Sequence, residues 1–159
     1  MKWDEQLFAS IILARGRPDA GMAASAFFVD LGCLGVKSAV AKPYLTPSEY
    51  AAMVRHMARD SSFVPCEPAL ALKIIETARS YAADLGFAPD PDYRVAVRLF
   101  GDVDPGSCDT DVTCGQDGKP LYVSGPHDDV PVILHRLEDK LGRDGFHFIV
   151  GAPSPFEVL

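Results

Sequence analysis

The sequence lacks the features that would assign the protein to a disulfide-rich, membrane or secreted class. It has only four cysteines in 159 residues, and their spacings form no disulfide framework, so we expect free thiols. No apolar run approaches the roughly 20 residues that a membrane helix requires. The apolar segment 7–14 is preceded by acids and followed by arginines, which is the wrong polarity for a signal peptide. We therefore expect a cytoplasmic protein with no membrane contact.

An excess of positive charge is absent as well. The formal net charge is −7. Residues 1–80 hold nine Lys/Arg against eight Asp/Glu, whereas residues 81–159 hold six against fourteen. An acidic surface repels phosphate backbones, so the composition disfavours nucleic-acid binding. A local basic patch could still form in the first half of the chain, but dispersed, solvated charges are the interpretation that we favour. The candidates for such a patch are Arg15, Arg17, Lys37 and Lys42.

What is present is an ordinary globular composition. Hydrophobic residues make up 48% of the chain and charged residues 23%, which argues against disorder. A chain of this length can bury about 70% of the surface that it exposes when unfolded. We find no internal repeat, low-complexity segment or linker. These observations predict a single globular domain over residues 1–151, with a surface tail over residues 152–159.

The first part of the chain predicts strands. Segments 7–14 and 22–31 are apolar and flank a loop rich in Gly, Pro and Asp, which is typical of an antiparallel pair. Neither segment alternates cleanly between apolar and polar residues, so both faces are covered or segment 7–14 is a buried helix. A third strand is predicted over residues 36–41, ending before Pro43.

Helices dominate the remainder. Thr46-Pro47-Ser48-Glu49 is a capping box with proline at the first helical position, which predicts a helix that ends near residue 59. Further helices are predicted to begin near residues 67, 91 and 129. Asp117-Gly118 lies between the β-like segments 112–114 and 121–124 and predicts a hairpin, and a closing strand follows at 146–150. This order predicts an α+β fold with a mainly antiparallel sheet and about four helices packed on one face.

Three sequence segments together resemble a family of uncharacterised bacterial proteins. They are Val29-Asp30-Leu31-Gly32-Cys33-Leu34-Gly35-Val36-Lys37, Ala82-Ala83-Asp84-Leu85-Gly86-Phe87 with Pro89 and Asp92-Tyr93, and Gly118-Lys119-Pro120-Leu121-Tyr122. The resemblance covers most of residues 8–125. It implies a bacterial, intracellular, single-domain protein, and it implies no activity, cofactor or catalytic residue.

Asp30 is the main candidate for chemistry, because it lies within an apolar strand. A buried carboxylate is costly unless it is paired or hydrogen-bonded, so Asp30 could be a metal ligand or a general base. The favoured alternative is structural: Asp30 would accept hydrogen bonds from the amides of the turn between Gly32 and Gly35, or would pair with Lys37. No second carboxylate follows at a recognisable spacing, although a later acid such as Asp92 could fold nearby.

The glycines and the cysteine beside Asp30 give weaker signals. Gly32, Gly35 and Lys37 do not have the spacing of a phosphate-binding loop, so the glycines are expected to serve a bulge or a close backbone approach. Cys33 would need an adjacent base to act as a nucleophile, and no histidine is placed to provide one, so a small buried side chain is expected.

Cys108 and Cys114 are separated by five residues, whereas zinc ligands usually have two to four residues between them. Cys66, His127 or His147 would have to complete a zinc site in space. Structural zinc is therefore the weaker alternative to free thiols.

The leading hypothesis is a non-catalytic protein-interaction or accessory module, with a protein partner or a second copy of the chain as its ligand. It requires that Asp30 is satisfied by backbone amides or by Lys37, and that an apolar patch is exposed elsewhere. The first alternative is a metal-dependent hydrolase or nuclease, in which Asp30 and Lys37 are catalytic and a divalent metal is the cofactor. The lesser alternative is a module stabilised by zinc on Cys108 and Cys114.

Overall fold

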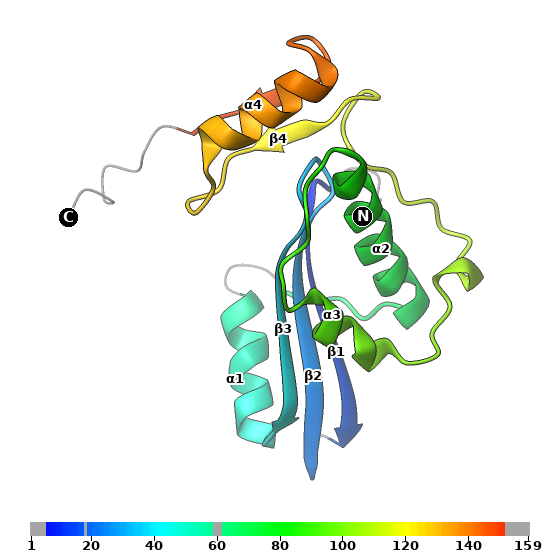
Figure 1. Cartoon of the computed structure of the whole chain (residues 1–159). Helices are drawn as coiled ribbons and strands as arrows, with labels where there is room; N and C mark the ends of the chain where they lie inside the picture. Colours follow the sequence, from blue (N-terminus) through cyan, green and yellow to red (C-terminus); the bar gives the residue numbers. More distant parts are fainter. Residues whose placement is uncertain (1–5, 18, 59–61, 152–159) are drawn as a thin grey trace, which may run out of the picture.

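A three-stranded antiparallel sheet in the order β1-β2-β3 forms the body of the molecule (Figure 1). The structure is a computed structural model, and it describes residues 6–17, 19–58 and 62–151. The strands are β1 (Phe8–Arg17), β2 (Gly21–Asp30) and β3 (Gly35–Leu45). The predicted pair is therefore confirmed, and segment 7–14 is a strand. The third strand runs past Pro43, because β3 is an edge strand whose outer side needs no donor there.

One face of this sheet carries the main core. Alternate side chains, among them Ile11, Phe27 and Ala39, pack against the helix α2 (Pro68–Asp84). A short helix α3 (Tyr93–Ala96) continues as the 3₁₀ helix η2 (Val97–Phe100) and covers the same face. The hydroxyl of Ser25 donates to the carbonyl oxygen of Ala96 at 2.8 Å, so the polar side chain on this face is satisfied.

The helix α1 (Pro47–Ala58) lies on the opposite side of the sheet from α2 (Figure 1). Its start confirms the predicted capping box. The amide of Thr46 donates to Glu49 Oε2 at 2.8 Å, and the amide of Glu49 donates to Thr46 Oγ1 at 3.3 Å. The helix contacts β2 and β3 but buries none of its own residues completely, so it covers this face only in part.

The last part of the chain forms a small β4–α4–β5 unit at the end of the main sheet (Figure 1). Strands β4 (Leu121–Val123) and β5 (His147–Ile149) are parallel, and α4 (Val130–Leu141) connects them. Tyr122, Leu137 and Phe146 pack with Cys33 and Leu85 in a second apolar cluster that joins this unit to the sheet. The amide of Leu121 also donates to the carbonyl oxygen of Gly32 at 3.0 Å.

The hairpin predicted around Asp117-Gly118 is only partly correct. Both residues have positive φ, 52° and 75°, and Gln116 pairs with Lys119 across them, as expected for a tight turn. However, the segment 112–114 is not a strand. Its apolar side chains Val112 and Cys114 pack on the main core, and β4 pairs with the later strand β5. The sequence therefore predicted the turn correctly, whereas the strand with which β4 pairs is determined by tertiary packing. A 3₁₀ turn, η3 (Pro105–Ser107), precedes this segment.

The α+β class with a mainly antiparallel sheet is confirmed. The helices are distributed more widely than the expected single layer, because α2 and α3 share one face while α1 contacts the other and α4 packs on the small parallel sheet. Within the described part of the chain, no helix is both long and apolar enough to cross a membrane. The predicted tail over residues 152–159 lies outside the described residues.

Candidate functional site

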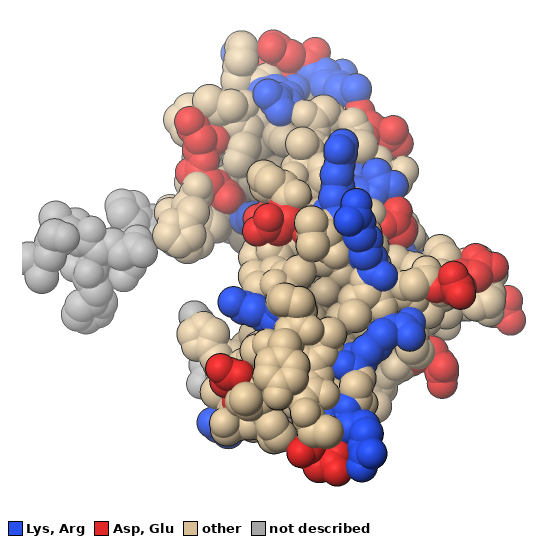
Figure 2. Space-filling view, turned by 60° about the horizontal axis from the view of Figure 1, so that its bottom comes forward, with Lys and Arg blue, Asp and Glu red and all other residues tan. Residues whose placement is uncertain are grey.

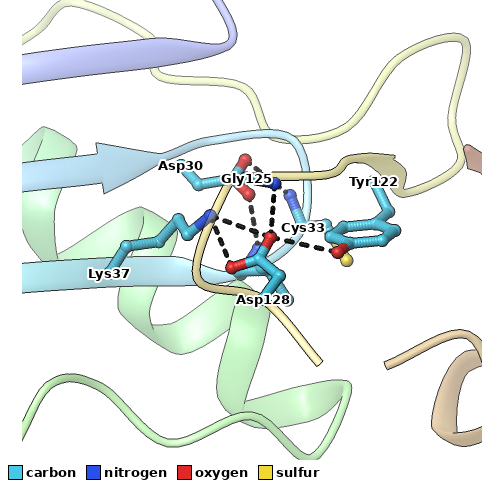
Figure 3. A network of polar contacts seen from close by, with 7 residues as sticks. Asp30, Cys33, Lys37, Tyr122, Gly125 and Asp128 are labelled. Atoms are coloured by element: carbon cyan, nitrogen blue, oxygen red, sulfur yellow. Dashed lines mark hydrogen bonds and ion pairs between the residues drawn. The ribbon is translucent and has the colours of Figure 1, made fainter. Parts of the chain in front are cut away.

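Asp30 ends strand β2, and its carboxylate is held by the turn that follows it (Figure 3). Oδ1 accepts hydrogen bonds from the amides of Gly32 at 2.8 Å and Cys33 at 3.1 Å, and Oδ2 accepts one from the amide of Leu34 at 3.2 Å. The side chain thus satisfies three buried backbone donors that the turn would otherwise leave without partners. This is the structural role that the sequence favoured.

The environment of Asp30 opposes ionisation. Burial raises the pKa of its carboxyl group, while the three amides and the more distant charge of Lys37 lower it, and the balance is a pKa above the ordinary value. A carboxyl group in this state has its lone pairs directed at the backbone of its own turn. Asp30 is only 1% exposed, and the turn beside it is tightly packed, since a Cβ added at Gly32 would stand 2.4 Å from the carbonyl oxygen of Leu121.

Lys37 pairs with Asp128 instead of Asp30. Its Nζ lies 3.0 Å from Asp128 Oδ1, and only 18% and 10% of the two side chains is exposed. Asp128 Oδ2 also accepts from the hydroxyl of Tyr122 at 3.0 Å and from the amide of Gly125 at 2.7 Å (Figure 3). Burial raises the pKa of Asp128, but the Gly125 amide, Lys37 and Tyr122 outweigh burial, so the pKa is lowered. This network ties β3 to the β4–α4–β5 unit.

The sequence did not indicate that Asp128 is the partner of Lys37, or that Tyr122 and Gly125 are partners of Asp128. Two adjacent acids, Asp128 and Asp129, precede the helix predicted to begin near residue 129, but a helix start needs only one cap. Asp129 takes that role, since its Oδ1 accepts from the amide of Val132 at 3.3 Å, and Asp128 remains for Lys37. An acidic residue next to the one that caps the helix could therefore have indicated a distant basic partner.

Cys33 is fully buried and is not an activated nucleophile. Burial, followed by the nearby charge of Asp30, raises the pKa of its thiol to about 12, so the reactive thiolate is disfavoured. The thiol packs in the apolar cluster with Tyr122 and Leu137, which fits the expected small buried side chain.

The geometry does not assemble a metal centre from the predicted residues. In the parts of the chain that the structure describes, no three His, Cys, Asp or Glu side chains lie close enough together to hold an ion. Cys108, Cys114 and Asp30 therefore belong to no such group of three among the described residues. All four cysteines are free. The backbone of Cys108 instead accepts a hydrogen bond from Lys73 Nζ at 2.8 Å.

The local basic patch, which was the disfavoured alternative, is not formed by Arg15, Arg17 and Lys37, because each has a separate partner. Arg15 donates to the carbonyl oxygens of Leu99 and Phe100, Arg17 pairs with Asp19, and Lys37 pairs with Asp128. Figure 2 shows Lys and Arg side chains in a narrow row across a mostly uncharged surface, with Asp and Glu side chains beside them. The charges are thus distributed and locally compensated.

A second polar group connects α2 with the start of α3. Glu76 accepts from Arg79 at 2.9 Å and from the hydroxyl of Tyr93, and Arg79 also stands over the Tyr93 ring. These three side chains satisfy one another, so the shallow cleft that Glu76 and Arg79 line with Lys73 and Asp84 presents balanced charges.

An apolar surface is exposed on the face of the main sheet that α1 covers only in part. We call it the open sheet face, and it consists of the outward positions of the three strands. These are Phe8, Ser10, Ile12, Ala14, Met22, Ala24, Ala26, Phe28, Ser38, Val40 and Lys42. Phe8 and Phe28 stack at a centroid distance of 5.7 Å, and Phe28 and Val40 are each 38% exposed. A sheet face turned to water usually carries polar side chains, and Ser10, Ser38 and Lys42 are exposed here. The large apolar side chains Phe28 and Val40 are exposed among them, whereas Met22, Ala24 and Ala26 are buried.

Comparison with known proteins gives no matching family model, no curated relative and no similar solved structure. The resemblance of segments 29–37, 82–93 and 118–122 to uncharacterised bacterial proteins therefore stays a prediction.

Proposed function

We propose that this chain is a non-catalytic protein-interaction or accessory module that binds a partner protein on the open sheet face. The observation that carries the proposal is the stacked aromatic pair Phe8–Phe28 beside Val40, because Phe28 and Val40 are each 38% exposed on the open sheet face. Contiguous exposed apolar surface of this kind marks interaction sites in monomeric domains.

The state of the buried polar groups supports the same proposal. Every buried side-chain nitrogen and oxygen atom of the described residues has a hydrogen-bond partner, and the Asp30 carboxylate is occupied by its own turn. Active sites usually keep reactive groups directed into a cavity, and these groups are directed into the fold. The four free thiols support a reducing compartment such as the cytoplasm.

The charge on the open sheet face indicates the chemistry of the partner. Lys42 is exposed, and it is the one charged residue among the strand positions that form this face. We therefore propose a partner segment with apolar side chains opposite Phe28 and Val40 and a carboxylate opposite Lys42, since an unpaired acid on the partner would gain from this cation.

Site-specific photo-crosslinking in the source organism tests the proposal. The photoreactive residue p-benzoylphenylalanine is placed at position 28, and at position 95 as the control, because Val95 is exposed on α3, which covers the other face of the sheet. We expect one protein adduct from position 28 that is absent from position 95 and is weakened at least several-fold by Lys42→Glu. Equal adducts from both positions, or an adduct that Lys42→Glu leaves unchanged, would contradict it.

A further inference from the structure

Strand β5 is an edge strand with an unusual amount of exposed apolar surface. Phe148, Ile149 and the following Val150 are 55%, 57% and 46% exposed. Among the described strands, β4 is the only neighbour of β5, and it pairs with three residues. Consecutive apolar residues on an exposed edge promote pairing with another strand, and natural proteins usually protect such edges with charge or proline.

The hydrogen bonds of β5 show which backbone groups remain available. The amide of His147 donates to Pro120, and the carbonyl oxygen of Ile149 accepts from Ser124, so His147 and Ile149 face β4. Backbone groups alternate in direction along a parallel strand, which turns the N–H and C=O of Phe148 away from β4. Phe148 therefore presents one donor and one acceptor at the outer edge.

The side chain of Phe148 needs a further neighbour. It is in register with the fully buried Tyr122, and its ring lies 6.0 Å from the ring of Phe146, which belongs to the cluster under α4. Phe148 thus extends this cluster to the edge of the small sheet, where more than half of its surface is exposed. A two-stranded sheet is marginal by itself, and added strands would complete both its hydrogen bonding and its core.

We propose that β5 pairs antiparallel with β5 of a second copy of this chain. With a two-fold axis at Phe148, the N–H of each Phe148 would donate to the C=O of the Phe148 in the other copy. The edge of β5 is therefore complementary to itself. Phe146 would then face Val150 of the other copy, and the two Phe148 rings would lie side by side. The paired segment 146–150 contains no acidic, lysine or arginine side chain, so no like charges are opposed.

The result would be a four-stranded sheet in the order β4-β5-β5-β4, with an α4 helix on each half. Because the paired strands are short, we expect a weak dimer that forms across the micromolar to millimolar range of concentration. Each chain carries a net charge of −7, so raising the salt concentration should strengthen the dimer by screening the repulsion.

Sedimentation equilibrium of the full chain tests the proposal. We expect the measured mass to rise toward that of two chains as the protein concentration increases. Over the same concentration range, the amide of Phe148 should exchange with solvent more slowly. Phe148→Lys, which opposes two like charges at the axis, should give a monomer. The matched control is Val95→Lys, because Val95 is 54% exposed on α3 and its change in charge is the same.

A second variant separates pairing from folding. Val150→Pro removes a donor that alternation turns outward, leaves the bonds of His147 and Ile149 with β4 in place, and should also give a monomer. A wild-type chain that stays monomeric, or a dimer that both β5 variants leave intact, overturns the proposal. Because the open sheet face is untouched by these variants, either result leaves the photo-crosslinking test of the proposed function unaffected.

Discussion

At the scale of single residues, the polar centre of the molecule is a set of matched donors and acceptors. Asp30 binds the amides of its turn, and Asp128 binds Lys37, Tyr122 and Gly125. The pKa values of these two carboxyl groups are shifted in opposite directions. The pKa of Asp30 is raised mainly by burial, whereas the hydrogen bonds and the charge of Lys37 lower the pKa of Asp128 despite burial. Their contributions to stability therefore depend on pH in opposite directions.

The lowered pKa of Asp128 predicts a specific loss of stability in acid. A carboxyl group whose pKa is lower in the folded state stabilises the fold fully above its unfolded pKa, near 3.8 here, and loses that contribution as the pH falls through the folded value. Asp128→Asn should therefore lower the free energy of unfolding at pH 7, and the difference from wild type should shrink as the pH falls below about 4. Urea unfolding followed by circular dichroism measures this.

Asp129→Asn is the matched control for that experiment. Asn caps a helix about as well as Asp, so this neighbour should unfold like the wild type at both ends of the pH range. A destabilisation by Asp128→Asn that stays constant from neutral to acid pH would show that the carboxylate charge is not what holds β3 to the β4–α4–β5 unit.

At the scale of elements, the approach of β3 to α2 depends on a glycine. Gly35 opens β3 with φ at +71°, and an added Cβ would stand 2.7 Å from Ala82 Cβ and 2.9 Å from the carbonyl oxygen of Ala78. The positive φ and the close packing against α2 each disfavour any side chain at position 35. The glycine pattern between residues 32 and 35 therefore serves close packing of backbone, as the sequence indicated, and not a phosphate-binding loop.

Gly35→Ala should destabilise the fold by about 2 to 4 kcal/mol, from the strained backbone together with the clash against α2. Gly118→Ala is the control, because Gly118 also has a positive φ, +75°, but no atom lies within 4 Å of its added Cβ. It should cost only about 1 kcal/mol, the backbone contribution alone. Equal costs in urea unfolding would show that α2 does not pack against Gly35 as closely as described.

Local signals predicted the elements more successfully than their neighbours. The capping box at Thr46, the cap at Asp129 and the turn at Asp117-Gly118 are short-range features whose partners lie a few residues away, and all three are present. The pairing of β4 with β5 and of Lys37 with Asp128 joins residues far apart in the chain. Many partners would satisfy the same pattern, so the sequence could not select them.

The open sheet face escaped prediction for a related reason. Phe27 and Phe28 are adjacent and equally apolar, yet Phe27 is fully buried and Phe28 is 38% exposed. Alternation along β2 assigns them to opposite faces, but only the placement of α1 determines how much of the second face is covered. An aromatic residue adjacent in sequence to a buried one can therefore lie on an exposed face.

At the scale of the whole molecule, a sheet covered by α2 and α3 on one side is left partly open on the other. The polar network of Asp30, Lys37 and Asp128 lies where the main sheet meets the β4–α4–β5 unit and serves that junction. The carboxylates at this junction bind backbone amides, Lys37 and Tyr122, and exposed apolar side chains lie on the open sheet face and the β5 edge. Central to this arrangement is the Asp30 carboxylate, which is occupied by the amides of its own turn.

The most direct test of this claim is the loss of amide NMR signal intensity during titration with Mn²⁺, a paramagnetic ion that replaces Mg²⁺ at carboxylate sites. We predict that the amides of Gly32, Cys33 and Leu34 lose no more intensity than the average amide, because they hold the Asp30 carboxylate and only 1% of that residue is exposed. Selective broadening of these amides at substoichiometric Mn²⁺, abolished by Asp30→Asn, would contradict the account and favour a metal-dependent enzyme.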